Sequence, residues 1–327
     1  MGGGAYNSGT LFKVTPQGAF TTLHSFCSLA NCADGGNPQT GLVSGADGEL
    51  YGMTAGGGAS CCGTIYKMTP AGKLTTLHSF DGTDGFCAPE CAPMVQAPDG
   101  NFYGVAGGGG TGTAPPGGFA GVFFRITPSG TYAVLYNFCS LANCADGGFP
   151  EALVYAGDRN FYGAALNGGN TSDPACPGFG CGTIFKITPE GVLTTLHVFN
   201  GATDGWVDQS LAQATNGIFY GADSAGGTGG CTLLAPGCGT IYALSAGLGP
   251  FVETLPTLGE VGQAIKILGS NLTGATAVSF NGTAAKFKVV SKSLIEALVP
   301  TCAATGFVTV TTPTRTLKSN VRFRVLP

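Results

Sequence analysis

The sequence predicts an all-β protein: a β-propeller of four to five four-stranded blades, followed by a small β-sandwich. Three observations predict this fold. One segment recurs along most of the chain, apolar and polar residues alternate within each copy, and the pattern changes near Pro250. We therefore expect a propeller domain at residues 1–249 and a sandwich domain at residues 250–327.

The recurring segment has four full copies and one shortened copy. They read GTLFKVTPQG (9–18), GTIYKMTPAG (63–72), GVFFRITPSG (121–130), GTIFKITPEG (182–191) and GTIYALSAG (239–247). Successive copies begin 54, 58, 61 and 57 residues apart. A β-rich unit of this length, with no helical pattern between copies, is typical of a propeller blade.

Each blade is expected to contain four strands. The first is short, as at Leu42–Val43, and ends in an Asp-Gly turn. The second carries a Tyr-Gly motif, the third is the recurring segment, and the fourth resembles KLTTLHSF at 73–80. Residues 9–26 supply only a third and a fourth strand, and the last copy has no obvious fourth strand. Either the strand at 20–26 completes the last blade, or a five-bladed ring stays two strands short.

The connections between strands differ strongly in length. Turns after the first and third strands are tight, whereas the loops after the second and fourth strands are long and variable. In an antiparallel blade both long loops leave from the same end of the strands. The paired cysteines lie in or beside these loops, so we expect one face to be cross-linked and to carry the function.

Composition limits the class of protein and of partner. Only 10% of residues are charged, glycine reaches 57 residues and the net charge is −4. Because the basic residues are scattered, nucleic acid is not an expected partner. No apolar run is long enough to span a membrane, and no cofactor is expected. No signal peptide opens the sequence, and Met1 leads into a segment that aligns with the middle of a repeat, as expected of a truncated or processed chain.

Thirteen cysteines are more than a cytosolic protein usually has. We predict five disulfides between close neighbours: Cys27–Cys32, Cys87–Cys91, Cys139–Cys144, Cys176–Cys181 and Cys231–Cys238. The pairing of Cys61 and Cys62 is left open, because a bridge between adjacent residues is strained. Cys302 is expected to be a free thiol buried in the sandwich. Zinc is the alternative for the pairs, but no CxxC spacing occurs, and no metal site is expected. Disulfides predict an extracellular or cell-surface location.

The repeat resembles the GloVer tandem repeat of exported bacterial proteins over roughly residues 2–247. The resemblance rests on G-T-[IL]-[FY]-K-[IVM]-T-P-x-G, then x-L-T-T-L-H-x-F, D-G and [LF]-Y-G. The last part resembles an IPT/TIG domain, through Ile267-Leu268-Gly269-Ser270-Asn271-Leu272, Val278-Ser279-Phe280-Asn281-Gly282 and Val299-Pro300. This resemblance implies an immunoglobulin-like sandwich. Neither resemblance supplies a catalytic signature.

Histidine and aspartate recur at fixed repeat positions. Three histidines and a tyrosine share one position: His24, His78, His197 and Tyr136. Four aspartates each precede a glycine in a blade-to-blade loop: Asp34, Asp84, Asp146 and Asp204. Equivalent positions in different blades lie far apart, so we expect the histidines to pack or to form hydrogen bonds rather than to build one metal site or triad. We expect the aspartates to bind loop backbone, with calcium as the alternative.

Residues that break the repeat symmetry are the candidates for a site. Aligned positions just before the innermost strands hold Gln39, Glu90, Glu151, Asp208 and Gln209. Aromatic residues lie in the matching loops: Phe86, Phe149 and Trp206. Innermost strands line a propeller channel, so we expect the carboxylates to converge at its mouth, where a pair is what glycoside hydrolysis needs. The other interpretation is a solvated rim with aromatic residues that pack the loops.

Three functions are compatible with these features. We predict a secreted or cell-surface propeller that binds an extracellular ligand, expected to be carbohydrate, through Gln39, Phe86, Phe149, Trp206 and Gln209. The first alternative is a glycoside hydrolase or other polysaccharide-active enzyme, with Glu90, Glu151 and Asp208 as its acids. The second is a structural surface or filament subunit that associates with itself through the incomplete first blade.

Overall fold

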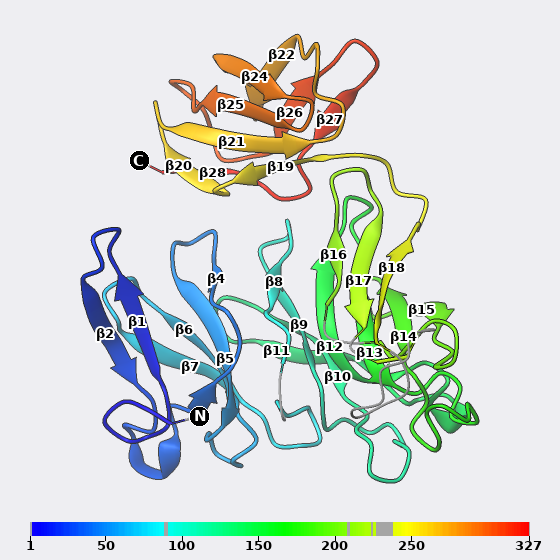
Figure 1. Cartoon of the computed structure of the whole chain (residues 1–327). Coiled ribbons are helices and arrows are strands. Elements are labelled where there is room, and N and C mark those ends of the chain that lie inside the picture. Colours follow the sequence, from blue (N-terminus) through cyan, green and yellow to red (C-terminus); the bar gives the residue numbers. More distant parts are fainter. Residues whose placement is uncertain (1, 88–90, 208–209, 224, 227–237, 327) are drawn as a thin grey trace. The chain divides into compact units, whose positions relative to one another are not determined.

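The computed structural model describes residues 2–87, 91–207, 210–223, 225–226 and 238–326. Its strands form eight sheets, and antiparallel pairs build the blade region (Figure 1). The helices in this part of the chain are two 3-10 turns, η1 (Ala30–Cys32) and η2 (Ala142–Cys144). No helix among the described residues is long and apolar enough to cross a membrane.

Three blades each form a complete meander. Blade 1 contains β3 (Gly36–Pro38), β4 (Val43–Ser44), β5 (Leu50–Gly56), β6 (Thr64–Met68) and β7 (Leu74–Ser79), with β3 and β4 both paired to β5. Blade 2 contains β8 (Val95–Gln96), β9 (Phe102–Ala106), β10 (Val122–Ile126) and β11 (Tyr132–Asn137). Blade 3 contains β12 (Gly148–Tyr155), β13 (Phe161–Asn167), β14 (Thr183–Ile187) and β15 (Leu193–Val198).

The two ends of the blade series are incomplete among the described strands. The first hairpin consists of β1 (Thr10–Val14) and β2 (Phe20–Ser25). Blade 4 has three strands, β16 (Ala212–Gln213), β17 (Phe219–Asp223) and β18 (Thr240–Leu244). Because β2 pairs with β1 in a sheet separate from β18, the strand at 20–26 does not complete the last blade.

Buried side chains join consecutive blades. Successive side chains of a strand point to opposite faces, so neighbours on β6 have different partners. Ile65 packs in a cluster with Phe124 of blade 2. Tyr66, the next residue, packs with Leu11 and Phe26 of the first hairpin. The third strand of a blade therefore contributes buried side chains to both neighbouring blades.

The Thr-Pro-x-Gly turns explain why one end of the blades carries so little chain. In the turn after β6, Gly72 donates its N–H to the Thr69 carbonyl at 2.8 Å. The Thr69 hydroxyl accepts the Lys73 N–H at 3.2 Å. Gly72 has a φ of +94°, a conformation that glycine adopts without steric cost. The turn at residues 70–72, together with the Thr69 hydroxyl, is thus enough to connect β6 to β7.

The last part of the chain is a β-sandwich. One four-stranded sheet has the order β19 (Val252–Leu255), β21 (Ala264–Gly269), β25 (Leu294–Leu298) and β24 (Phe287–Ser291). The other has the order β23 (Thr283–Ala284), β22 (Ala277–Phe280), β26 (Val308–Thr311) and β27 (Thr316–Lys318). A parallel pair joins β20 (Leu258–Glu260) to β28 (Arg324–Leu326). The core includes Ile267, Phe280 and Val310. The all-β prediction, with propeller-type blades followed by a sandwich, is confirmed.

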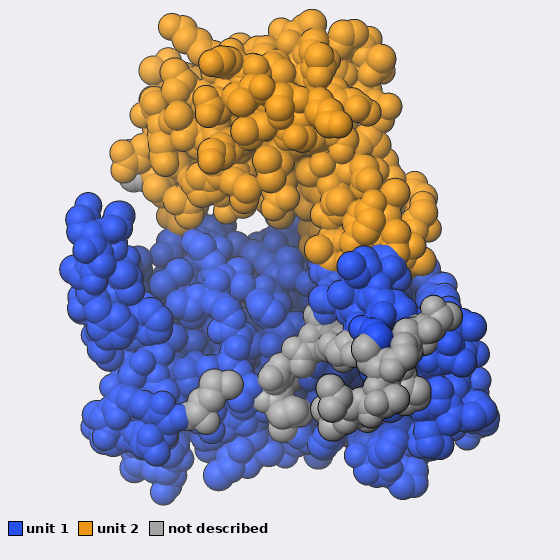
Figure 2. Space-filling view, viewed as in Figure 1, with its two compact units in different colours: residues 1–154, 161–211, 221–242 blue, residues 155–160, 212–220, 243–327 orange. Residues whose placement is uncertain are grey.

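The chain divides into two compact units (Figure 2). The first comprises residues 1–154, 161–211 and 221–242, and the second comprises residues 155–160, 212–220 and 243–327. The division passes through β17 and β18, so the second unit includes parts of the blade region as well as the sandwich. The domain boundary at 249/250 stays a prediction.

Truncation of a side chain between blades should destabilise the whole blade region. Phe124 is fully buried and lies 6.0 Å, centroid to centroid, from Phe80 of blade 1. We expect Phe124→Ala to lower the free energy of unfolding by about 3–5 kcal/mol, since it leaves a cavity between two sheets. Val192→Ala, on an exposed turn, should change it by less than about 0.5 kcal/mol. Urea denaturation measures both, and equal effects would contradict this description of the core.

Candidate functional site on the disulfide-bonded loops

The long loops gather at the end of the blades opposite the Thr-Pro-x-Gly turns (Figure 1). Four of the predicted disulfides are present in or beside these loops: Cys27–Cys32, Cys87–Cys91, Cys139–Cys144 and Cys176–Cys181. Cys238 is also disulfide-bonded, and its predicted partner Cys231 lies outside the described residues. The loop end of the blades is therefore cross-linked, as predicted.

The remaining described cysteines are free thiols: Cys61, Cys62 and Cys302. The prediction that Cys302 is buried is wrong, because its side chain is exposed. It lies in a tight turn in which Ala303 donates its N–H to the Pro300 carbonyl at 3.1 Å. The left-handed backbone at Cys302, with a φ of +64°, belongs to this turn rather than to a strand that points into the core.

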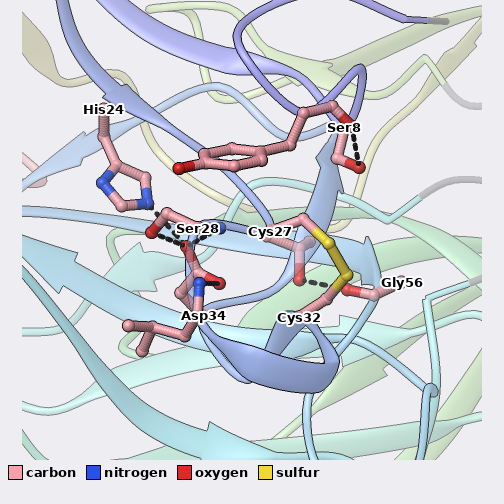
Figure 3. Close-up of a disulfide and its surroundings, with 10 residues drawn as sticks. Ser8, His24, Cys27, Ser28, Cys32, Asp34 and Gly56 are labelled. Atoms are coloured by element: carbon pink, nitrogen blue, oxygen red, sulfur yellow. Dashed lines mark hydrogen bonds and ion pairs between the residues drawn. A yellow bond between two sulfur atoms is a disulfide. The ribbon is translucent and has the colours of Figure 1, made fainter.

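A buried carboxylate fixes the loop between the first hairpin and blade 1 (Figure 3). Asp34 Oδ2 accepts the Ser28 hydroxyl at 2.7 Å and the Ser28 N–H at 3.0 Å, and Oδ1 accepts the Leu29 N–H at 3.2 Å. His24 Nε2, on β2, lies 3.0 Å from Asp34 Oδ2. Asp34 thus ties the fourth strand to the loop that follows it, and we call this arrangement the aspartate clamp.

Blades 1, 2 and 3 repeat the clamp with their own residues. His78 Nε2 lies 2.7 Å from Asp84 Oδ2, and His197 Nε2 lies 3.1 Å from Asp204 Oδ2. In blade 2 the Tyr136 hydroxyl donates to Asp146 at 2.7 Å. The predicted hydrogen-bonding role of the histidine position is confirmed, and so is the binding of loop backbone by the aspartates.

Electrostatics favour the charged form of the clamp carboxylate. Burial alone raises the pKa of Asp34, but the hydrogen bonds from Ser28 and Leu29 outweigh it, so the pKa lies below its ordinary value. Burial and the bond to Asp146 raise the pKa of Tyr136 to about 12, which keeps that hydroxyl a donor. The clamp groups are engaged with one another, so their arrangement is suited to holding loops rather than to catalysis.

Three phenylalanines form a row: Phe86 and Phe119 lie outside the strands of blade 2, and Phe149 lies at the start of β12. Ring centroids of Phe86 and Phe119 are 5.8 Å apart, and those of Phe119 and Phe149 are 5.2 Å apart. Phe86 and Phe149 were candidates from the sequence, whereas Phe119 was not, because it lies in a loop whose length and composition vary between copies. It could have been noticed as the aromatic residue in an otherwise Gly-, Pro- and Thr-rich stretch. We call these residues the aromatic row.

Three of the other predicted site residues are described, and they lie in three separate segments of the chain: Gln39, Glu151 and Trp206. Trp206 is exposed and pairs as an isolated bridge with Ala225. Gln39 is exposed, and Glu151 is buried on β12. Glu90, Asp208 and Gln209 lie outside the described residues. A carboxylate pair at a channel mouth therefore stays a prediction.

A pocket of about 490 Å³ opens among three loops. Its walls come from residues 113–116, residues 139–143, and Thr171 with Gly178. Ser140 belongs both to the pocket and to the clamp, since its hydroxyl lies 3.1 Å from Asp146 Oδ2. Sequence reasoning missed this pocket because its walls are separated along the chain.

One group of side chains has the composition of a metal site. Possible ligand atoms of Asp173, Cys176 and Cys181 lie within 4.8 Å of one another. The two sulfur atoms are joined in a disulfide, so neither is the thiolate that binds a metal. Asp173 accepts N–H groups from Ala175 at 2.9 Å and from Gly201 at 3.3 Å. The carboxylate thus holds the two loops together.

Family models match both parts of the chain. The Gloeobacter/Verrucomicrobia repeat matches residues 1–173, and the IPT/TIG domain matches residues 252–325. Both resemblances noted in the sequence are confirmed, together with the immunoglobulin-like character of the sandwich. A search of curated proteins found no match.

Several solved structures resemble the chain at low identity. A gluconolactonase from Xanthomonas campestris is 14% identical, with 89% of this chain and 79% of that chain covered and a TM-score of 0.37. A luciferin-regenerating enzyme is 14% identical, with coverages of 75% and 74% and a TM-score of 0.46. The extracellular domain of a hybrid two-component system from B. thetaiotaomicron is 12% identical, with coverages of 94% and 40% and a TM-score of 0.41. At these identities and TM-scores, neither the ligand nor the activity of those proteins can be inferred for this chain.

Removal of the clamp charge should destabilise the protein in a pH-dependent way. Asp34→Asn should lower the free energy of unfolding at pH 7 by about 1–3 kcal/mol, because buried N–H groups lose an ionised acceptor. Since the folded-state pKa of Asp34 is below its ordinary value of 3.8, the wild-type advantage is complete above that value and is lost as the pH falls through the folded-state pKa. Urea titrations at pH 7 and pH 3, with Glu190→Ala as the exposed control, measure this. A difference that grows on acidification would contradict the clamp.

Reduction should loosen the loops and spare the sheets. Each observed disulfide spans a sequence separation of four or five residues, so it constrains little of the unfolded chain. We expect reduced protein to keep its far-ultraviolet β-signal while proteolysis within the loops becomes faster. Non-reducing peptide mapping checks the pairing, and disulfides between different blades would contradict it.

Proposed function

The chain belongs to the Gloeobacter/Verrucomicrobia repeat family, and from the geometry of its loops we propose that it binds an extracellular carbohydrate. The binding surface consists of the pocket and the aromatic row. Of the residues predicted from the sequence, this proposal uses Phe86 and Phe149, and it adds Phe119, which contacts both.

The size and the lining of the pocket favour a small, uncharged and hydroxyl-rich ligand. Its volume of about 490 Å³ is within the usual range for small-molecule sites. Its polar lining side chains are Thr113, Ser140, Asn143 and Thr171, all of which are neutral. Leu141 and the two prolines at 115–116 supply apolar walls. Hydroxyl and amide groups next to apolar surface suit a sugar better than a phosphate, which would call for basic residues.

The aromatic row supports the same class of ligand and carries the proposal. Phe119 is exposed, and it lies in the loop that also supplies Thr113 and Pro115 to the pocket. Aromatic faces offer a large apolar area with few rotatable bonds, on which the C–H face of a sugar ring packs. A ligand that fills the pocket can therefore extend along this loop.

The loops are held before a ligand arrives. Cys139–Cys144 and the clamp at Asp146 fix the pocket wall that carries Ser140. Fixed loops lose less conformational entropy on binding, which improves affinity without added contacts. The disulfides also support an extracellular location, since such bonds persist in oxidising compartments.

Hydrolysis of a glycoside would require a second carboxylate near the first. Of the three predicted acids, the described residues include only Glu151, which is buried. Two carboxylates about 5–10 Å apart are needed for either stereochemical outcome. Because the described geometry supplies a pocket and aromatic surface, it supports binding more directly than catalysis.

The test is binding to a panel of neutral polysaccharides and their oligosaccharides, followed by calorimetry. We expect Phe119→Ala and Thr171→Val to weaken binding of the best glycan about fivefold or more, since each removes a contact worth on the order of 1 kcal/mol or above. Val192→Ala, an exposed apolar change on the opposite turns, should bind as wild type does. No binding to any glycan, or wild-type affinity in Phe119→Ala, would overturn the proposal.

A further inference from the structure

The apolar pattern of the repeat stays uncovered at both ends of the blade series. In β6 the residues Tyr66 and Met68 are fully buried. The same two positions of β1 hold Phe12 and Val14, each of which is 54% exposed. Phe20 of β2 is 60% exposed and stacks on Phe12, with ring centroids 4.9 Å apart. These three residues form what we call the leading face.

The interior of the protein shows what covers such a face. Tyr66, Met68 and Leu74, which occupy the leading positions of blade 1, pack against Leu11 and Phe26 of the first hairpin. The leading positions of blade 2 hold Phe124, Ile126 and Tyr132, which pack against residues of blade 1 that include Ile65, Leu77 and Phe80. In both cases the cover is the opposite side of a preceding blade of the same repeat.

Blade 4 presents that opposite side without a cover. Ile241 on β18 is 84% exposed, whereas its repeat equivalents Ile65 and Ile184 are at most 1% exposed. On β17 of the same sheet, Tyr220 is 39% exposed, although its equivalent Tyr51 is buried and stacks on Phe102 of the following blade at 3.9 Å. We call the side of blade 4 that carries Ile241 the trailing face.

The two incomplete ends do not add up to one blade. Both β1 and β18 are copies of the third strand of the repeat. The first hairpin and blade 4 together contribute five described strands, with the third strand twice, so a four-stranded blade cannot accommodate both sheets as they are paired. The leading face of the first hairpin and the trailing face of blade 4 are instead suited to stack on each other, as the faces of successive blades do.

We propose that copies of this chain associate head to tail, with the leading face of one copy packed on the trailing face of the next. The partner is a second copy because every copy carries both faces, and because the repeat itself already packs these two kinds of face together between its inner blades. Such a contact joins two different surfaces, so it propagates into a closed ring or an open chain of molecules. In this contact the faces of the sheets stack, so no new ladder of hydrogen bonds forms between the two copies.

Sedimentation velocity of the full chain, from low micromolar to millimolar concentration, measures the association. We expect the wild-type mass to rise with concentration and to depend little on salt, because the contact is apolar. Phe12→Ser and Ile241→Ser should each weaken association about tenfold or more. Val192→Ser, an exposed apolar change outside both faces, should behave as wild type.

Mixing the two variants tests the head-to-tail arrangement. Phe12→Ser keeps an intact trailing face and Ile241→Ser keeps an intact leading face, so the mixture should form a one-to-one dimer that does not grow further. Circular dichroism checks folding, and Phe20→Ser replaces Phe12→Ser if the latter unfolds. A wild type that stays monomeric, variants that associate as wild type does, or a mixture that stays monomeric would each overturn the proposal.

Discussion

Each blade of this protein depends on its neighbours to cover the apolar side chains of its third strand. Ile65 and Tyr66 are adjacent in sequence, yet they are buried by different blades. A single blade is one sheet, and both of its faces carry apolar side chains that it cannot bury alone. Stability therefore arises from the stacking of successive blades, as in repeat proteins generally. The same requirement explains why the recurring segment keeps its apolar pattern, and why that pattern is exposed at the first hairpin and at blade 4.

A second set of interactions, the aspartate clamp and the disulfides, acts mainly on the long loops. The aspartate clamp joins the fourth strand of a blade to the loop that leads to the next blade, and the disulfides close the same loops. The disulfides also pack against the core, since Cys87 and Cys91 belong to the buried cluster that contains Ile65 and Phe124. Their effect is to fix the positions of side chains such as Ser140 on a surface that would otherwise be mobile. Loops tolerate sequence changes better than the strands that they connect, so the proposed binding surface can vary while the stacked blades stay the same.

The blades and the clamp were predictable because their causes are local or repeat at a fixed spacing. The Asp-Gly positions and the shared histidine position lie within one blade and its following loop, and most cysteine partners are five residues apart or fewer. The pocket and the contact of Phe119 with Phe149 were not predictable, because they depend on how loops from different blades meet. Burial of Cys302 was predicted wrongly, because a turn, and not the strand before it, sets the orientation of its side chain.

Amide hydrogen exchange of the dilute full chain tests the dependence on stacking most directly, because it reports the opening free energy of each strand separately. If blades are stabilised by cover on both faces, the amides of β6, β10 and β14 should exchange slowest. Those of β1 and β18, which have one apolar face uncovered, should exchange faster by at least about tenfold. Equal protection of all five strands would contradict the account, because strand stability would then be independent of the neighbouring blade.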